Sequence, residues 1–181
     1  MRYIAFFRGI NVGGKNIVKM ADLKQLFLSL GFLDVKTYIQ SGNVIFSSAE
    51  NEGSLVSLIS KAFESQFGFN SVPIIRSGEE LAKIINTHPF TAEEIDSAQN
   101  KTPDVEHEYV YLSNKPINAD KINKLFEGLV GEDKIYIEGR ELYFLCAQGI
   151  RDSKLAAKLA KYQHPMTSRN FKTMNKIINI I

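Results

Sequence analysis

The sequence predicts an α+β protein of two ferredoxin-like (α-β plait) domains with antiparallel sheets, followed by a C-terminal helix. Two observations lead to this prediction. Strand-like and helix-like segments in the first half follow the order β-α-β-β-α-β, and the second half repeats that order. Two right-handed crossovers flanking one hairpin produce this fold. The expected strand order is therefore 4-1-3-2, with both helices on one face of each sheet.

The first plait is expected to use four strands and two helices. In chain order they are residues 3–7, 20–30, 35–40, 43–48, 54–68 and 72–75. The two helical segments carry apolar residues at three- and four-residue spacing. Ser54 is the expected N-cap of the second helix. The middle strands flank a Ser41-Gly42 turn, which predicts a hairpin, and Pro73 favours an edge position for the last strand.

The second plait shows the same pattern of segments. Its strands are expected at residues 108–112, 134–138, 141–146 and 165–170, and its helical stripes at 122–129, 155–159 and 171–181. Two capping boxes, Ser77 with Glu80 and Thr91 with Glu94, predict short helices between the plaits. We therefore expect a first domain at 1–78, a helical connecting segment at 79–106, and a second domain with the C-terminal helix at 107–181.

Composition restricts the class of protein. The 181 residues are 44% hydrophobic, which is enough for one or two packed cores. The single cysteine, Cys146, excludes an intramolecular disulfide and lies in an apolar run typical of a core. No apolar run approaches the roughly 20 residues of a membrane helix, and there is no signal-peptide pattern. A cytoplasmic protein with no membrane partner is expected, and its oligomeric state is left open.

A glycine-rich loop, "RGINVGGKN" at residues 8–16, follows the first strand. Residues 9–15 match the pattern G-x-x-x-x-G-K of a phosphate-binding P-loop. However, Asn16 stands where that motif needs a hydroxyl for Mg²⁺, and the helical pattern begins only near Met20. The antiparallel sheet is also wrong for a P-loop, so a Walker-type nucleoside triphosphatase is rejected. Exposed N–H groups beside Arg8 and Lys15 could still bind an anion. The alternative is that the glycines only permit a tight turn.

Topology predicts that this loop and the hairpin turn share one end of the sheet. The first and second strands run parallel in a plait, so the loop after the first lies beside the turn after the second. The functional hypothesis adds the late "TSRN" segment to the same rim. The predicted ligand-binding residues are Arg8, Asn11, Gly13, Gly14, Lys15, Gln40, Ser41, Asn43, Arg169 and Asn170. Amides, a hydroxyl and cations suit a phosphate or a carboxylate.

Three classes of function remain open on these residues. The leading hypothesis is a binding protein for a small anionic or phosphate-bearing ligand. The second is nucleic-acid binding, since residues 151–181 carry a net charge of +6 and residues 1–78 a net of +3. Sheet aromatics could stack bases in that case; they are Tyr3, Phe7, Tyr38 and Phe46. The simpler interpretation is that these rings pack between the two plaits and bury both sheets.

The third class is an enzyme whose catalytic residues we cannot name. The three histidines, His88, His107 and His164, are far apart, and no residues have metal-ligand spacing. We expect no metal and no cofactor.

Three stretches resemble a known bacterial family. They are "YIAFFRGINVGGKNIVKM", "LGFLDVKTYIQSGNVIF" and "TSRNFKT", and they resemble the family catalogued as domain of unknown function sixteen-ninety-seven. The resemblance covers nearly the whole chain and implies two ferredoxin-like plaits, with residues 8–16, 40–43 and 167–173 as the family signature. It implies no catalytic residues. Two positions depart from the family pattern: Lys19 replaces a usual proline and Phe171 a usual tryptophan.

Overall fold

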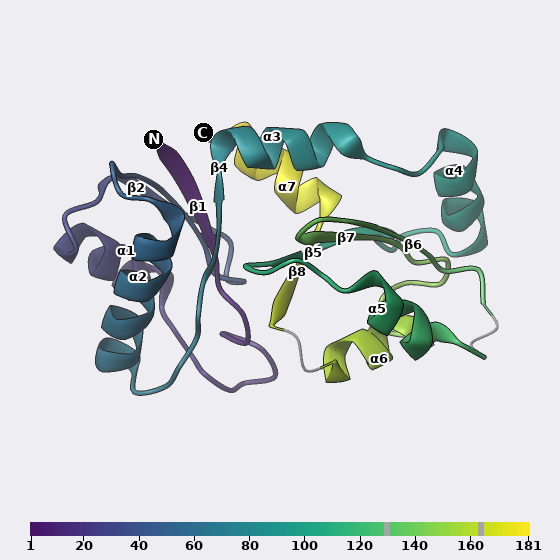
Figure 1. The fold of residues 1–181 in the computed structure, drawn as a ribbon, viewed down its shortest axis with the longest axis horizontal. Coiled ribbons are helices and arrows are strands. Elements are labelled where there is room, and N and C mark those ends of the chain that lie inside the picture. Colours follow the sequence, from purple (N-terminus) through teal and green to yellow (C-terminus); the bar gives the residue numbers. More distant parts are fainter. Residues whose placement is uncertain (129–130, 163–164) are drawn as a thin grey trace. The chain divides into compact units, whose positions relative to one another are not determined.

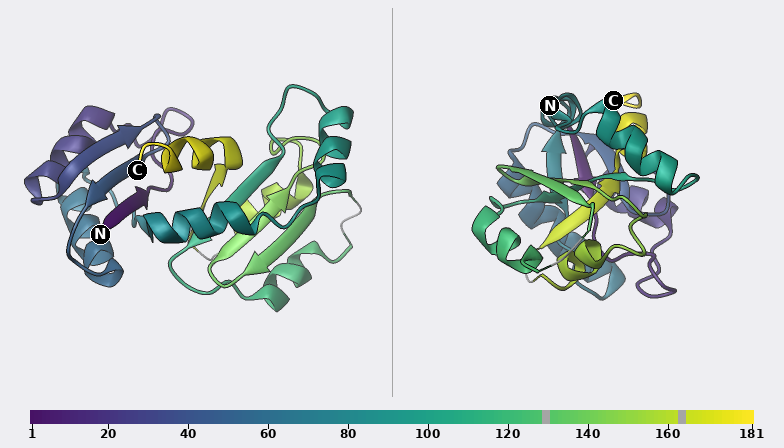
Figure 2. Two further views of the ribbon diagram at one scale, coloured as in Figure 1. Left: turned by 90° about the horizontal axis from the view of Figure 1, so that it is seen from above. Right: turned by 90° about the vertical axis from the view of Figure 1, so that its right-hand side faces the viewer.

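The computed structural model describes residues 1–128, 131–162 and 165–181. The chain divides into two compact units (Figures 1 and 2). The first unit holds residues 1–83 and 176–181, and the second unit holds residues 84–175. The domain boundaries expected from the sequence stay a prediction. Leu129, at the end of one predicted helical stripe, and His164 lie outside the described residues.

The first unit is a ferredoxin-like plait, as predicted. Its elements are β1 (Arg2–Phe6), α1 (Met20–Ser29), β2 (Leu33–Tyr38), β3 (Asn43–Ser47), α2 (Glu52–Phe67) and β4 (Ile74–Ser77). The four strands pair antiparallel in the order β2-β3-β1-β4. The β4 strand lies at an edge directly after Pro73, which has no N–H to donate to a neighbour. Helix α3 (Gly78–Thr87) follows it.

The core of the first unit lies between its sheet and the helices α1 and α2. Each helix buries a stripe of three residues, Leu23, Leu26 and Phe27 in α1, and Leu55, Ile59 and Phe63 in α2. Aromatic rings fill the space between them, and Phe7 stacks on Phe63 with ring centroids 4.9 Å apart. Burying such stripes is the main source of helix stability in a small domain.

The core of the first unit contains three of the aromatic residues that were considered for base stacking. Tyr3, Phe7 and Phe46 belong to the buried helix-side cluster and are at most 7% exposed. They therefore cannot present their faces to nucleic-acid bases. The expectation that these rings pack between the two plaits was wrong for these three, because they pack against α1 and α2 within the first unit. Tyr38, the fourth ring, is half-buried.

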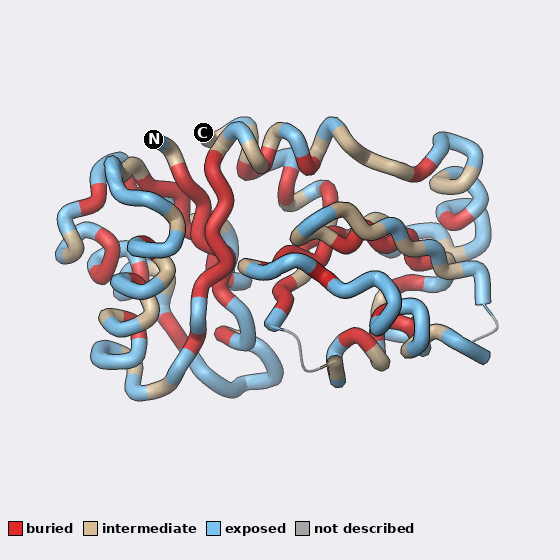
Figure 3. Tube along the Cα trace, viewed as in Figure 1, coloured by how far each residue is buried: buried red, intermediate tan, exposed pale blue. Residues whose placement is uncertain are grey.

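The second unit repeats the topology. Its elements are α4 (Ala92–Lys101), β5 (Glu108–Ser113), α5 (Ala119–Phe126), β6 (Lys134–Glu138), β7 (Glu141–Leu145), α6 (Lys154–Lys161), β8 (Met166–Asn170) and α7 (Phe171–Ile178). The strand order is β6-β7-β5-β8, again antiparallel. Residues of α5 and α6 pack with Leu142, Phe144 and Cys146 in one buried cluster. In both units the inner strands β1 and β5 are largely buried (Figure 3).

The helix starts agree with the predicted caps except in α2. Both predicted capping boxes are present, and Ser77 and Glu80 exchange two hydrogen bonds of 2.8 and 3.1 Å. The N-cap of α2 is Asn51, whose Oδ1 accepts from the backbone N–H of Ser54 at 3.0 Å. The assignment of Ser54 as this cap was wrong, because the helix begins earlier, at Glu52.

Candidate functional site

The glycine loop folds into a small hairpin of its own. The N–H of Lys15 donates to the carbonyl of Val12, and that of Asn11 to the carbonyl of Asn16, both at 3.1 Å. Gly13 and Gly14 form the turn with φ of 59° and 73°. Positive φ at both central residues is what a two-residue β-hairpin turn prefers. Thus these two glycines are required by the turn itself.

Two asparagines brace this hairpin, and both have positive φ. Asn11 donates from Nδ2 to the carbonyls of Val18 and Gln40, each at 2.9 Å, and accepts from the Val18 N–H at 2.8 Å. Asn16 donates to the carbonyl of Gly9 at 2.9 Å. Asparagine tolerates the left-handed region better than most residues and also supplies these side-chain bonds.

The glycine loop and the hairpin turn after β2 lie side by side, as the strand order predicts. Besides the Asn11 bond to Gln40, the N–H of Phe7 donates to the carbonyl of Gly42 at 2.9 Å. Ile10 packs so closely on Gly42 that a Cβ there would lie 2.4 Å from its Cδ1. Asn43 is fully buried and donates to the carbonyl of Tyr38 at 2.9 Å and to Ser41 Oγ at 3.1 Å.

The predicted rim residues therefore divide into two groups. Asn11 and Asn43 point toward the backbone and hold the two loops together. Arg8, Lys15, Gln40 and Ser41 are exposed to solvent. Within the described part of the chain, the side chains of Arg8 and Lys15 make no hydrogen bond or ion pair. Two cations without carboxylate partners, at a pole shared by two loops, form a surface that attracts anions.

Sequence reasoning missed the apolar part of this surface. Val12 is 67% exposed and Ile17 is 66% exposed, on either side of exposed Lys15. We call Val12, Lys15 and Ile17 the outer face of the loop. Its signal in the sequence was two aliphatic residues within an otherwise polar, glycine-rich stretch.

Arg169 and Asn170 belong to the second unit, where each has a local role. Arg169 is 7% exposed, and its Nη1 donates to Thr167 Oγ1 at 2.9 Å and to the Ser168 carbonyl at 2.8 Å. Burial lowers the pKa of its guanidinium to about 10, which leaves it charged at neutral pH. The Oδ1 atom of Asn170 accepts from the N–H of Thr173 at 2.8 Å and caps the start of α7. Their membership of the rim stays a prediction.

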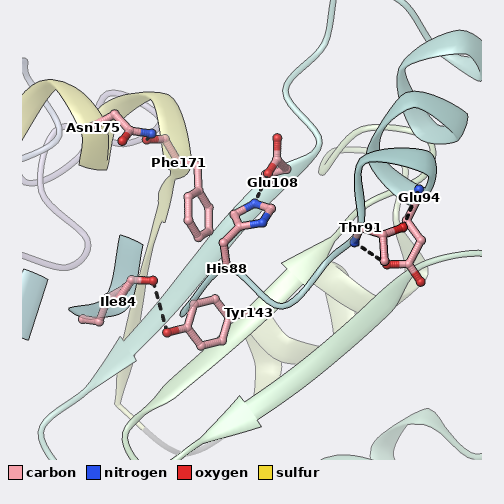
Figure 4. A network of polar contacts seen from close by, with 8 residues as sticks. All are labelled: Ile84, His88, Thr91, Glu94, Glu108, Tyr143, Phe171 and Asn175. Carbon is pink, nitrogen blue, oxygen red and sulfur yellow. Dashed lines mark hydrogen bonds and ion pairs between the residues drawn. The ribbon is translucent and has the colours of Figure 1, made fainter. Parts of the chain in front are cut away.

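A second polar cluster surrounds His88 in the second unit (Figure 4). Nε2 of His88 pairs with Glu108 Oε1, and its ring meets Phe171 edge-on with centroids 4.6 Å apart. The hydroxyl of Tyr143 donates to the Ile84 carbonyl at 3.3 Å, and burial raises the pKa of Tyr143 to about 12. These contacts attach the C-terminal half of α3 and the segment after it to β5, β7 and α7. We interpret them as architectural, because no Ser, Thr or Cys side chain of the described chain hydrogen-bonds to His88.

Neither a metal-binding cluster nor a membrane-spanning helix occurs among the described residues. Outside positions 129–130 and 163–164, no three His, Cys, Asp or Glu side chains gather in a way that could hold a metal ion. Within the same limits, no helix has the length and apolarity needed to cross a bilayer.

The fold and this loop pair define a class of protein: two ferredoxin-like units in one chain, the first with a glycine loop braced against a hairpin turn. The chain belongs to the family described as "Protein of unknown function (DUF1697)", whose model matches residues 1–143. It is similar to the conserved bacterial protein SP0830 from Streptococcus pneumoniae, at 27% identity and a TM-score of 0.75. The match covers 99% of this chain and 97% of that one. No curated protein matches this sequence.

Proposed function

We propose that this protein binds a small anionic or phosphate-bearing ligand at the rim formed by residues 8–16 and 40–43. One observation carries the proposal: Asn11 joins the two loops through the Gln40 carbonyl, while Arg8 and Lys15 remain exposed beside that junction. The hydrogen-bonded backbone holds the Cα atoms of Arg8 and Lys15 in place. Little conformational freedom is therefore lost when a ligand binds.

The chemistry of the exposed groups suits a phosphate or carboxylate. The guanidinium of Arg8 can donate two parallel hydrogen bonds to one anion, and the ammonium of Lys15 adds a point charge. Gln40 and Ser41 supply an amide and a hydroxyl at the same pole. No Asp or Glu occurs between residues 8 and 21, so no neighbouring carboxylate in this stretch competes for the cations.

The test is a titration of the full chain with inorganic phosphate. Calorimetry measures the affinity, and the chemical shifts of the backbone amides in NMR spectra locate the site. Shifts confined to residues 8–16 and 40–43 support the proposal. Arg8→Ala and Lys15→Ala should each weaken binding about tenfold or more, because a hydrogen bond to a charged group contributes about 1.5–3 kcal/mol. Lys61→Ala, an exposed lysine on α2, is the matched control and should bind normally. Equal losses in Lys61→Ala and Lys15→Ala, or an absence of rim shifts, would contradict the proposal.

Salt dependence separates this function from nucleic-acid binding. A phosphate bound by two cations weakens slightly with salt, whereas a nucleic acid that contacts many cations weakens steeply. The burial of Tyr3, Phe7 and Phe46 weakens base stacking as a basis for that alternative, since Tyr38 is the one half-buried ring of the four. An enzyme would instead show turnover in a substrate screen, lost in Arg8→Ala while folding is preserved.

A further inference from the structure

The outer face of the glycine loop combines aliphatic and cationic side chains without any acid. Val12 and Ile17 are each about two-thirds exposed, at 67% and 66%, and flank Lys15. Residues 8–19 also include Arg8 and Lys19, both exposed, and contain no Asp, Glu or aromatic residue. A single exposed aliphatic residue needs no explanation, but here two lie on one hairpin together with exposed cations.

Two asparagine side chains hold the loop in shape by bonding to its backbone and to the neighbouring turn. The amides of Asn11 and Asn16 bond to the backbone at Val18, Gln40 and Gly9, and Val18 itself is 1% exposed. Val12 and Lys15, between the two asparagines in sequence, and Ile17, directly after them, are exposed to solvent. The aliphatic groups are thus displayed by the same hydrogen bonds that shape the rim, and docking them requires little reordering.

The chemistry of the face selects among anionic partners. Nucleic acid would offer phosphates to the cations, but aliphatic side chains gain little from a phosphodiester backbone, and residues 8–19 contain no ring to stack on bases. A bilayer of anionic phospholipid offers both parts. Its phosphates lie at the surface, where they attract Lys and Arg, and the acyl chains below accept aliphatic groups.

We infer that the rim binds the phosphate of anionic phospholipid headgroups and that the outer face docks the protein on a lipid surface. This inference rests on the function proposed for the rim. The sequence led us to expect no membrane partner because no apolar run is long enough to span a bilayer. Surface docking needs no spanning segment, only an exposed loop of this composition.

The experiment is cosedimentation of the full chain with vesicles. Vesicles of phosphatidylcholine with phosphatidylglycerol should sediment the protein, and vesicles of phosphatidylcholine alone should not. Lys15→Ala should lower the partition coefficient about fivefold, the effect of one cation near an anionic surface. The double variant Val12→Ser/Ile17→Ser should reduce vesicle binding more than it reduces binding of soluble glycerol phosphate.

A matched control tests whether any exposed aliphatic pair would have the same effect. Leu33 and Leu58 are 68% and 42% exposed elsewhere in the first unit, and Leu33→Ser/Leu58→Ser should bind vesicles normally.

If glycerol phosphate binds the rim but anionic vesicles do not sediment the protein, the lipid inference fails and the rim function stands. If neither binds, both fail. Single-stranded RNA bound more tightly than vesicles, with no effect of Val12→Ser/Ile17→Ser, would also overturn the inference.

Discussion

At Gly42 two constraints on the backbone coincide. Its φ is +76°, a region that L side chains rarely adopt, and an added Cβ would lie 2.4 Å from Ile10 Cδ1 and 3.0 Å from Phe7 Cβ. The close approach of Ile10 is part of the contact between the glycine loop and the hairpin turn. A side chain at Gly42 would therefore push apart the two loops that form the rim.

We predict that Gly42→Ala lowers the free energy of unfolding by about 3 kcal/mol or more, because strained φ and overpacking each cost about 1–3 kcal/mol. Gly13→Ala is the control: its φ is +59°, but the space around it is open, so only about 1 kcal/mol is expected. Urea denaturation of both variants measures the difference. Equal losses would mean that Ile10 moves aside without cost.

Cys146 provides a prediction about pH. The residue is fully buried, and burial, with the nearby charge of Asp133, raises the pKa of its thiol to about 11 from 9.0. The folded state therefore keeps this proton at pH values where the unfolded chain has lost it. The contribution of the thiol to stability is full below pH 9 and is lost as the pH rises toward about 11.

Urea denaturation from pH 8 to pH 11 checks this expectation. Stability should fall more steeply in the natural protein than in Cys146→Ala, because the variant has no thiol to ionise at that position. Parallel pH profiles for the two proteins would show that the thiol does not titrate differently in the folded state.

At the residue scale, the folded chain decides which way each side chain of the predicted rim points. Asn11 and Asn43, two of the predicted ligand-binding residues, donate to backbone carbonyls, and their role in ligand binding stays a prediction. An amide suits either purpose, and its direction depends on which carbonyl oxygens the folded chain places nearby. Val12 and Ile17 were missed for the opposite reason, since an aliphatic residue in a loop is expected to find a core.

At the scale of elements, helix starts test how well local sequence predicts structure. The capping boxes at Ser77 and Thr91 were predicted correctly because both partners lie within one turn of the chain. In α2 the true cap is Asn51, three residues before the predicted Ser54. Residues 51–54 offer two capping side chains, and packing of the α2 stripe on the sheet decides between them.

We predict that Asn51→Ala destabilises the protein by about 1 kcal/mol, the usual contribution of an N-cap side chain. Ser54→Ala is the matched control and should have a smaller effect, because Ser54 takes part in the cap through its backbone N–H, which alanine retains. Thermal or urea denaturation compares the two. A larger loss in Ser54→Ala would restore Ser54 as the cap.

At the scale of the whole molecule, each sheet has inner strands that are hydrogen-bonded to a neighbouring strand on both sides. In the first sheet β1 lies between β3 and β4, and in the second β5 lies between β7 and β8. Hydrogen exchange from such positions requires the largest opening of a unit. We therefore predict slowest exchange at the amides of Ile4–Phe6 and Val110–Leu112, and fast exchange in the edge strands β2 and β6.

Hydrogen–deuterium exchange with mass spectrometry or NMR tests this order. Protection in β2 equal to that in β1 would show that the edge of the first sheet is covered in solution. The comparison is made within each unit, so it does not depend on the stability of the other.

The sequence by itself determined the plait topology of both halves, the place of the glycine loop beside the hairpin turn, and most helix caps. Each follows from periodicity, turn residues or the handedness of crossovers, which act over a few residues or have one favourable solution. Only the tertiary structure decided which rim side chains face inward and that Tyr3, Phe7 and Phe46 lie beneath α1 and α2. Those outcomes depend on contacts between residues far apart in the chain, whose positions are known only once every element is packed.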